Sequence, residues 1–449
     1  MNNIETNSSV CSESSQRERA NSFHISSDRN RIERKYAHLI REELSFNNVV
    51  SFVGNKSVPL LRLYRYKEAF AYDFVQEFLK RLDLTPKDYV FDPFCGMGTT
   101  LFVSMLKRIP SIGIDRLPVA TFIAQTLPLF LFLKNGELKS TFEQLRKEVS
   151  NVKPAPVAMD VAIMQKAFSD KNLLSLRRWK TAIDNLPTPL HDIFLLLFFS
   201  ILESCSYTSK DGQFLRIKTE KIILSPEEAL SAKVEQAEHD LIIMKQFYGI
   251  EFMQGLPIPQ VYLGDARDLS KIPFEQLPTA IITSPPYPNR YDYSRSYSLE
   301  LCFHFCKDFE ELKRIRFSLL RSHIESRIEQ NEKPPHPSLA EVVEILEKRP
   351  LNNPRIPIML TTYFVDMQKC IEQWANVLDK NAKVAIVIDN VRFEGEIIPV
   401  DLIFSEMAEK VGFKVKEIII CRYKGNSSQQ MKKFGKIPVR ETVVVWQHQ

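Results

Sequence analysis

The chain has 449 residues, 44% of them hydrophobic and 26% charged, with a formal net charge of +5 at pH 7. This is the composition of a globular protein, and the length exceeds what one core usually fills, so we expect one large domain with a substantial insertion, or two domains. The mild positive charge permits an anionic partner without requiring one.

Seven cysteines show no paired spacing, which excludes a disulfide scaffold and fits a reducing, cytoplasmic location. Cys302 and Cys306 lack a second pair of ligands, which favours a buried helix face over a metal site. The longest apolar run, IFLLLFFSIL at 193–202, is shorter than the roughly 18 residues that a membrane span needs. We expect it to be a core helix.

Residues 1–35 begin with the polar text MNNIETNSSVCSESSQRERANS, which lacks the apolar stretch of a signal peptide, and predict a disordered leader. From Tyr89, YVFDPFCGMGTT indicates an apolar strand that turns through glycines into a helix, and SIGID at 111–115 indicates the next strand. A βαβ beginning of this kind predicts an α/β fold with a parallel sheet.

Residues 118–258 show long helical patterns, which separate the first two predicted strands from the later ones. In SPEEALSAKVEQAEHDLIIMKQF, Ser225 can cap a helix, Pro226 suits its first position, and Glu228 completes a capping box. We therefore predict a mostly helical insertion.

Strand-like text returns at 260–269, 279–287, 382–390, 415–423 and 440–446, with helices expected around 363–378 and 399–412. Only a loop joins the last two strands, so they should be antiparallel neighbours. The sequence thus predicts a seven-stranded, mostly parallel sheet with a terminal antiparallel hairpin. Residues 303–356 interrupt it a second time with a basic segment.

Three loops at strand ends predict a ligand site. Gly96 and Gly98 lie where a strand turns into a helix, which lets a ligand approach the backbone and the free N–H groups of the helix. Asp115 ends the second strand, where an acidic side chain can bind a ribose diol, and Asp265 follows the third strand at the next carboxyl end along. Because no Walker lysine and no third glycine is present, a nucleoside without a phosphate chain fits better than ATP or NAD.

The segment TAIITSPPYPNRYDYSR (279–295) places two prolines directly after an apolar strand. Proline fixes φ and cannot donate to a sheet, so Pro285 and Pro286 should end the strand in a stiff turn. That turn presents the Ser284 hydroxyl, the Pro285 carbonyl and the flat face of Tyr287. We expect Tyr291 and Tyr293 to be packing residues.

Taken together, DPFCGMGTT, GID, GDAR and TSPPY resemble the amino-methyltransferases of DNA, and SPPY most resembles their cytosine-N4 branch. The resemblance covers about residues 62–130 and 260–446 and implies a Rossmann-like class I methyltransferase fold with S-adenosylmethionine as cofactor. It implies cofactor contacts through the glycine loop, the two acids and the preceding helix (Asp92, Phe94, Gly96, Gly98, Thr99, Asp115, Asp265 and Phe70).

The resemblance also implies a reaction on double-stranded DNA with a flipped target base, and a cognate restriction endonuclease as functional partner. Ser284, Pro285, Pro286 and Tyr287 would then orient the exocyclic amine and stack the base. Adenine-N6 methylation and RNA guanine-N2 methylation remain open as alternatives, as does a binding protein without catalysis. Carbon-5 methylation is disfavoured, because none of the cysteines follows a proline.

Basic residues predict where nucleic acid lies, although a solvated surface would look the same. The candidates lie after SPPY, in the second interruption, in the polar turn SYTSKDGQFLR and in a loop before the last strand (Arg290; Lys313, Arg316 and Arg321; Lys210, Gln213 and Arg216; Lys432 and Lys433).

The predicted organisation is a leader (1–35) and a catalytic domain (36–117 and 259–449). The helical insertion (118–258) is a DNA-recognition candidate, and the second basic insertion is 303–356.

Overall fold

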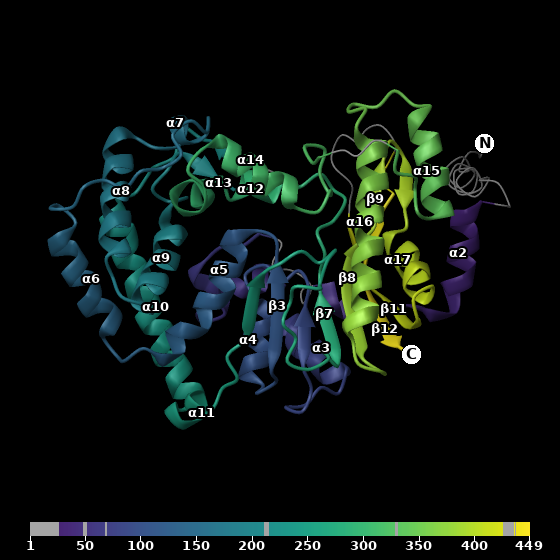
Figure 1. Cartoon of the computed structure of the whole chain (residues 1–449), viewed down its shortest axis with the longest axis horizontal. Helices are drawn as coiled ribbons and strands as arrows, with labels where there is room; N and C mark the ends of the chain where they lie inside the picture. The colour runs from purple at the N-terminus through teal and green to yellow at the C-terminus, as the bar shows by residue number, and fades with distance from the viewer. Residues whose placement is uncertain are drawn as a thin grey trace, which may run out of the picture.

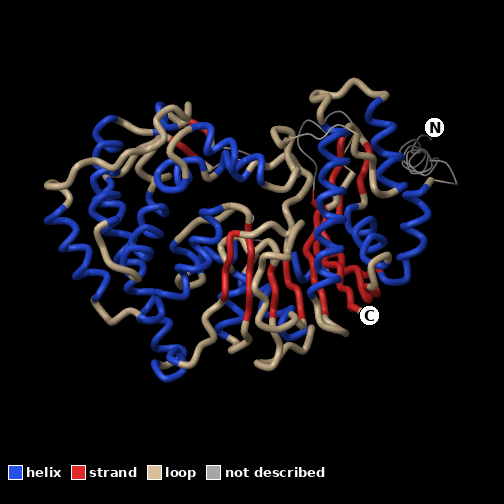
Figure 2. Tube along the Cα trace, in the orientation of Figure 1, coloured by secondary structure: helices blue, strands red, loops and turns tan. Residues whose placement is uncertain are grey.

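The computed structural model of the chain describes residues 27–47, 52–67, 70–210, 215–327, 331–424, 435 and 437–449. Helices cover both faces of a central sheet, and a separate group of helices lies beyond one of its ends (Figures 1 and 2). The α/β class predicted from the sequence is confirmed.

The sheet has eight strands in the spatial order β1, β11, β12, β8, β7, β2, β3, β6. Their bounds are β1 (Ile40–Glu42), β2 (Val90–Asp92), β3 (Ser111–Asp115), β6 (Gln260–Leu263), β7 (Ala280–Thr283), β8 (Lys383–Asp389), β11 (Phe413–Lys424) and β12 (Val439–His448). Among the described strands of this sheet, only β12 runs antiparallel to its neighbours. The mostly parallel sheet and its terminal hairpin are therefore confirmed.

The strand order is that of a doubly wound sheet. Numbered from β2, the strands from β6 to β8 lie in the order 3-2-1-4-5, and the order reverses between β2 and β7. The short edge strand β1 is the eighth strand, and the sequence did not predict it. It pairs with β11 over only three residues, which are too few to show the alternation of apolar and polar residues typical of a strand.

Side chains of the buried strands alternate between the two faces of the sheet, as the pleat requires. Val90 packs with α3 (Tyr72–Arg81) and α4 (Thr99–Leu106), whereas Phe91 packs on the opposite face. That opposite face is covered by α2 (Asp28–Tyr36), α15 (Pro337–Glu347), α16 (Ile356–Val377) and α17 (Val400–Glu409).

The region 118–258 is mostly helical, as predicted. It contains α5 (Pro118–Thr126), η5 (Leu127–Phe132), α6 (Glu137–Glu148), α7 (Met164–Ala167), α8 (Asp170–Asp184), α9 (Leu190–Ile201), α10 (Pro226–Tyr248), α11 (Ile250–Gln254) and the hairpin of β4 (Thr208–Ser209) and β5 (Arg216–Ile217). The predicted capping box at Ser225 and Glu228 begins α10, and the apolar run forms the buried helix α9. Figure 1 shows α6, α8, α9 and α10 grouped beyond β3.

The second interruption also consists of short helices. They are α12 (Tyr293–Ser296), α13 (Ser298–Glu300), the π-helical turn η6 (Leu301–Phe305) and α14 (Phe309–Ser318), and α15 follows. Cys302 and Cys306 are buried in the apolar core there. Figure 1 shows α12 and α14 between the helical group and the sheet-bearing part of the molecule.

The remaining described elements are short. They are η1 (Ala37–Leu39), η2 (Leu44–Asn47), η3 (Phe52–Ser57), η4 (Leu61–Leu63) and the hairpin of β9 (Val391–Phe393) and β10 (Glu396–Ile398).

The expectation of a disordered leader over 1–35 is wrong for 28–35, which form helix α2. Ser27 caps this helix, and Ile32 and Tyr36 are buried against the sheet-covering helices. Arg31 and Lys35 both pair with Glu406 of α17, at 2.6 and 2.9 Å. The polar composition concealed the helix because its partners are acids that lie some 370 residues away in the sequence. Residues 1–26 lie outside the described part.

Within the described ranges, no single helix has the length and apolar character to cross a membrane. The segments Pro118–Phe132 and Glu137–Glu148 reach that length only as a pair, and they are bent by 115°.

Asp240 joins the helical group to the segment around Leu60 that precedes α3. The carboxylate is fully buried on α10 and accepts from the Leu60 backbone N–H at 2.8 Å and from Arg62 Nε at 2.9 Å. Leu60 has a φ of +66°, which is a strained value for a bulky residue. The hydrogen bond to Asp240 therefore stabilises an unfavourable backbone conformation.

We expect Asp240→Ala to lower the free energy of unfolding by about 3 kcal/mol, because it leaves a buried N–H and a half-buried guanidinium without their acceptor. Urea denaturation measures the change. Glu235→Ala, at an exposed position of the same helix, is the control and should change stability by less than about 0.5 kcal/mol. Equal effects of the two substitutions would contradict the anchoring role.

Candidate functional site

A cavity lies at the carboxyl ends of four adjacent parallel strands. Its walls include the residues that follow β2 (Pro93–Met97), β3 (Asp115–Leu117), β6 (Gly264–Arg267) and β7 (Ser284 and Pro286). This edge of the sheet, where the strand order reverses, is where open α/β sheets bind ligands. The loops that the sequence singled out therefore meet at one cavity.

The glycine loop between β2 and α4 adopts the backbone that only glycine takes easily. Gly96 and Gly98 have φ values of +51° and +82°, in the left-handed region. A Cβ on Gly98 would lie 2.7 Å from the Cβ of Ala124, so a larger residue would displace α5. Gly96 lines the cavity, and Gly98 lies behind it as the N-cap of α4.

Asp115 ends β3 and fixes the glycine loop from the side. Its two carboxylate oxygens accept from the backbone N–H groups of Gly96 and Leu117, both at 2.9 Å. Burial raises the pKa of Asp115 above its ordinary value, although these bonds act in the opposite direction. Each oxygen keeps a further lone pair, so the residue can also accept from a ligand in the cavity.

Asp92, for which the resemblance implies a cofactor contact, lies beneath the loop and is not among the cavity-lining residues. In this structure its carboxyl group supports the loop from below. Its carboxyl is 1% exposed and accepts from Phe94 N at 3.1 Å and from Thr283 Oγ1 at 2.6 Å. Burial raises the pKa of Asp92 to about 7, against hydrogen bonds that lower it. The residue ties the end of β2 to the end of β7.

Phe70, Phe94, Thr99 and Asp265, for which the resemblance implies cofactor contacts, line the cavity. The buried Thr99 hydroxyl has no hydrogen-bond partner among the described residues and is therefore available to a ligand. Asp265 already accepts from Arg267 through both carboxylate oxygens, at 2.9 and 2.8 Å. These bonds lower the pKa of Asp265, although burial acts in the opposite direction.

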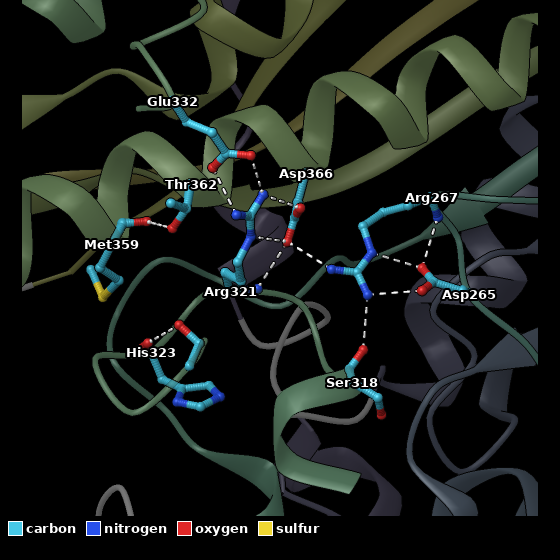
Figure 3. A network of polar contacts seen from close by, with 10 residues as sticks. Asp265, Arg267, Ser318, Arg321, His323, Glu332, Met359, Thr362 and Asp366 are labelled. Atoms are coloured by element: carbon cyan, nitrogen blue, oxygen red, sulfur yellow. Dashed lines mark hydrogen bonds and ion pairs between the residues drawn. The ribbon is translucent and has the colours of Figure 1, made fainter. Parts of the chain in front are cut away.

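Arg267 is part of a network that holds the second interruption over the cavity (Figure 3). It donates to the Ser318 carbonyl at 2.9 Å and to Asp366 of α16 at 3.0 Å. Asp366 is 1% exposed and also accepts from Arg321, which in turn bonds Glu332. The predicted DNA contact of Arg321 is therefore wrong, because its side chain is buried and bonded to two acids.

Sequence reasoning missed His323 as a cavity residue. It lines the cavity and is 1% exposed, and neither ring nitrogen has a partner among the described residues. In Figure 3 its ring points away from the arginine network. Burial lowers the pKa of His323, which favours the neutral ring. Tyr293, expected to be a packing residue, also lines the cavity.

Ser284 and Pro286 bring the stiff turn after β7 into the cavity wall. The Ser284 hydroxyl lies 3.2 Å from the Tyr287 hydroxyl and 3.3 Å from the Val387 carbonyl. Tyr287 lies next to the cavity and is not among its lining residues, and its hydroxyl lies 3.4 Å from Glu441. Pro285 is buried behind the turn.

The predicted DNA-binding residues divide into three groups. Lys210 is 4% exposed and pairs with Glu300 at 2.6 Å, so its predicted contact with DNA is wrong. Lys313 is partly exposed on α14, Arg216 is exposed on β5, and Arg290 is half-buried near the ring of Phe393. Gln213, Lys432 and Lys433 lie outside the described residues.

Arg316 pairs with Asp292 at 3.1 Å, which reduces its freedom to hold a phosphate. It nevertheless lines a second, open cavity together with three more basic residues, Lys313, Arg327 and Arg355.

Comparison with known proteins finds curated relatives that match most of the chain. Type II methyltransferase M.BsoBI of Geobacillus stearothermophilus is 32% identical over 479 residues, which cover 95% of this chain and 93% of that protein. Type II methyltransferase M.AvaI of Nostoc sp. is 31% identical over 440 residues, which cover 91% and 90%. No family model matches the chain.

Solved structures give weaker matches. TrmN from Thermus thermophilus aligns with a TM-score of 0.30 at 10% identity, over 88% of this chain and 53% of that one. The rRNA methyltransferase aviRa from Streptomyces viridochromogenes aligns with a TM-score of 0.29 at 13% identity, over 90% and 94%.

The raised pKa of Asp92 predicts a pH-dependent stability. In the folded chain the pKa is about 7, whereas an unfolded aspartate has about 3.9. Between these values the folded chain retains a proton that the unfolded chain releases, so this contribution is present at low pH and is lost as the pH rises toward 7.

We expect the free energy of unfolding of the wild type, minus that of Asp92→Asn, to fall by about 1.4 kcal/mol for each pH unit between about pH 5 and 6.5. Urea denaturation at several pH values measures it. A difference that is constant over this range would contradict the assignment.

Proposed function

Because the chain belongs to the family of Type II methyltransferases, which methylate DNA with S-adenosylmethionine, we propose that it methylates the exocyclic N4 amine of cytosine within a short DNA sequence. The observation that carries this proposal is the position of Ser284 and Pro286 in the wall of the cavity that the glycine loop also lines. The motif around them, SPPY, resembles that of the cytosine-N4 branch.

The cavity suits S-adenosylmethionine by the groups in its wall. It offers the Asp115 carboxylate, the free Thr99 hydroxyl and the apolar faces of Phe70 and Phe94, a set that fits a nucleoside with an amino-acid tail. We propose that Asp115 accepts from the ribose hydroxyls and that Asp265, fixed by Arg267, faces the adenine. When bound, S-adenosylmethionine supplies the methyl group from a sulfonium.

The chain's own task is to present the amine. The nitrogen lone pair of the base amine is delocalised into the ring, so the site must orient the nitrogen and accept hydrogen bonds from its N–H groups as positive charge develops. We propose that the Ser284 hydroxyl and the Pro285 carbonyl are these acceptors, and that the two prolines keep them from moving. The Tyr287 ring lies next to the cavity and not in its wall. Stacking of the flipped base on Tyr287 would therefore take place beside the cavity.

DNA would approach over the second interruption. The open cavity there combines the four basic residues named above with the exposed rings of Phe309 and Phe317. Lysine and arginine on such a surface supply sequence-independent affinity for phosphates. A duplex held there would have to extrude the target base to bring its amine to Ser284.

Adenine-N6 methylation is the second candidate, because an adenine amine would also have to be oriented by Ser284 and Pro285.

We also propose that a restriction endonuclease of the same sequence specificity is the functional partner, since modification protects host DNA from such an enzyme. Genomic DNA from cells that express the protein, sequenced with detection of modified bases, identifies the base and the recognised sequence together.

We expect Ser284→Ala to slow methyl transfer by about 100-fold or more, since it removes one acceptor aimed at the developing charge, and to leave cofactor binding nearly unchanged. Single-turnover transfer to duplex DNA, with nucleoside mass spectrometry, measures the rate and identifies the base. Ser270→Ala, at an exposed position, is the control. Wild-type turnover in Ser284→Ala would refute the assigned mechanism.

We expect Lys313→Ala to weaken DNA binding to a similar degree for all sequences and to reduce the slope of log K against log salt by about 1. Salt titrations of DNA binding measure both effects. Lys348→Ala is the matched control, because Lys348 is the exposed C-cap residue of α15 and also pairs with a glutamate of the adjoining helix. An unchanged slope in Lys313→Ala would remove α14 from the DNA interface.

A further inference from the structure

A chain of hydroxyl groups connects Ser284 with a carboxylate on the last strand of the sheet. Ser284 Oγ lies 3.2 Å from the Tyr287 hydroxyl oxygen, which lies 3.4 Å from Glu441 Oε1. Glu441 is 3% exposed and lies on β12, about 150 residues beyond the SPPY turn. If the Ser284 hydroxyl accepts a hydrogen bond from the target amine, its own proton must be donated to another group.

The carboxylate is held in place by the neighbouring strands. Arg422 lies opposite Glu441 on β11 and donates to Oε2, and Lys424 donates to Oε1 at 2.8 Å. Asp389 lies opposite Glu441 on β8, and Lys424 bridges the two acids. These two cations donate to both oxygens of the carboxylate and fix its orientation.

The Glu441 carboxylate accepts hydrogen bonds through both of its oxygens, and this sets the direction of the chain. Tyr287 must donate its single hydroxyl proton to Glu441, so its oxygen presents lone pairs to Ser284. Ser284 therefore donates toward Tyr287, and the Val387 carbonyl at 3.3 Å is a second acceptor for the same proton. The serine can then offer a lone pair to an amine in the cavity.

The same chain strengthens the serine as an acceptor. Hydrogen bonds that run in one direction polarise one another, and a chain that ends on an anion gives its first oxygen more negative character. The positive charge that develops on the amine during transfer would thus be stabilised by a carboxylate that never touches the substrate.

We propose that Glu441, acting through the Tyr287 hydroxyl, is the positioning residue that makes Ser284 a strong hydrogen-bond acceptor for the target amine. This role rests on the proposed function of Ser284. It adds to that function a residue from β12, and it gives the Tyr287 hydroxyl a part distinct from any stacking by its ring.

The test compares Glu441→Gln and Tyr287→Phe in the full-length chain. A glutamine can donate to Tyr287 and reverse the chain, and a phenylalanine keeps the ring while removing the hydroxyl. Each should slow single-turnover methyl transfer about tenfold, the usual effect of losing one hydrogen bond, with unchanged affinity for S-adenosylmethionine. Glu441→Asp, which keeps the carboxylate, should lose less activity than Glu441→Gln.

The double variant distinguishes a connected chain from two unrelated structural losses. With the Tyr287 hydroxyl gone, Glu441→Gln should slow transfer no further, so the combined loss should equal about one single loss. Losses that multiply would overturn the proposal, as would a wild-type rate in Tyr287→Phe. Glu417→Gln is the control, because it removes an ion-paired carboxylate from the adjacent strand β11.

If Glu441→Gln does not fold, Tyr287→Phe alone decides, since its ring packing is retained. Failure of the proposed function gives different results. Methyladenine as the product would refute the cytosine assignment while leaving the comparison of rates valid. A wild-type rate in Ser284→Ala would refute the serine mechanism even if Glu441→Gln is slow.

Discussion

The parallel pairing of β6, β3, β2, β7 and β8 is the constraint on which the rest of this structure depends. Parallel strands end at the same edge of a sheet, and the reversal of strand order between β2 and β7 opens that edge to a ligand. Four loops from residues 93 to 286 converge there only because the hydrogen bonds of the sheet fix their starting points. The cavity is a consequence of this pairing.

Buried charges then lock the two interruptions of the sheet onto this frame. Asp240 fastens the segment at Leu60 to the helical group, and Asp366 binds both Arg267 and Arg321 beside the cavity. Each carboxylate is nearly inaccessible to solvent and would be costly to bury without its partners. Such contacts favour a single placement of the inserted segments. A single placement is what a cavity wall needs if it is to orient a ligand.

The catalytic side of the cavity has the same character. The SPPY turn is rigid because of its two prolines, and its serine is backed by a tyrosine and a carboxylate from the antiparallel strand β12. An acceptor whose proton already points away from the substrate needs no reorganisation when charge develops. In the proposed mechanism, the antiparallel hairpin β11–β12, which otherwise only closes the sheet, thereby contributes to the chemistry.

The sequence by itself determined the strand at DPFCGMGTT, the stiff turn at SPPY, the capping box of α10 and the family resemblance, because each depends on residues within a few positions of one another. Tertiary structure alone decided which charges are free. Lys210 and Arg321 resemble phosphate ligands in the sequence and are buried against Glu300, Asp366 and Glu332 in the fold. Helix α2, His323 in the cavity wall and Glu441 behind Ser284 were likewise hidden. Their environments are made by partners far away in the chain, and no local pattern encodes such pairings.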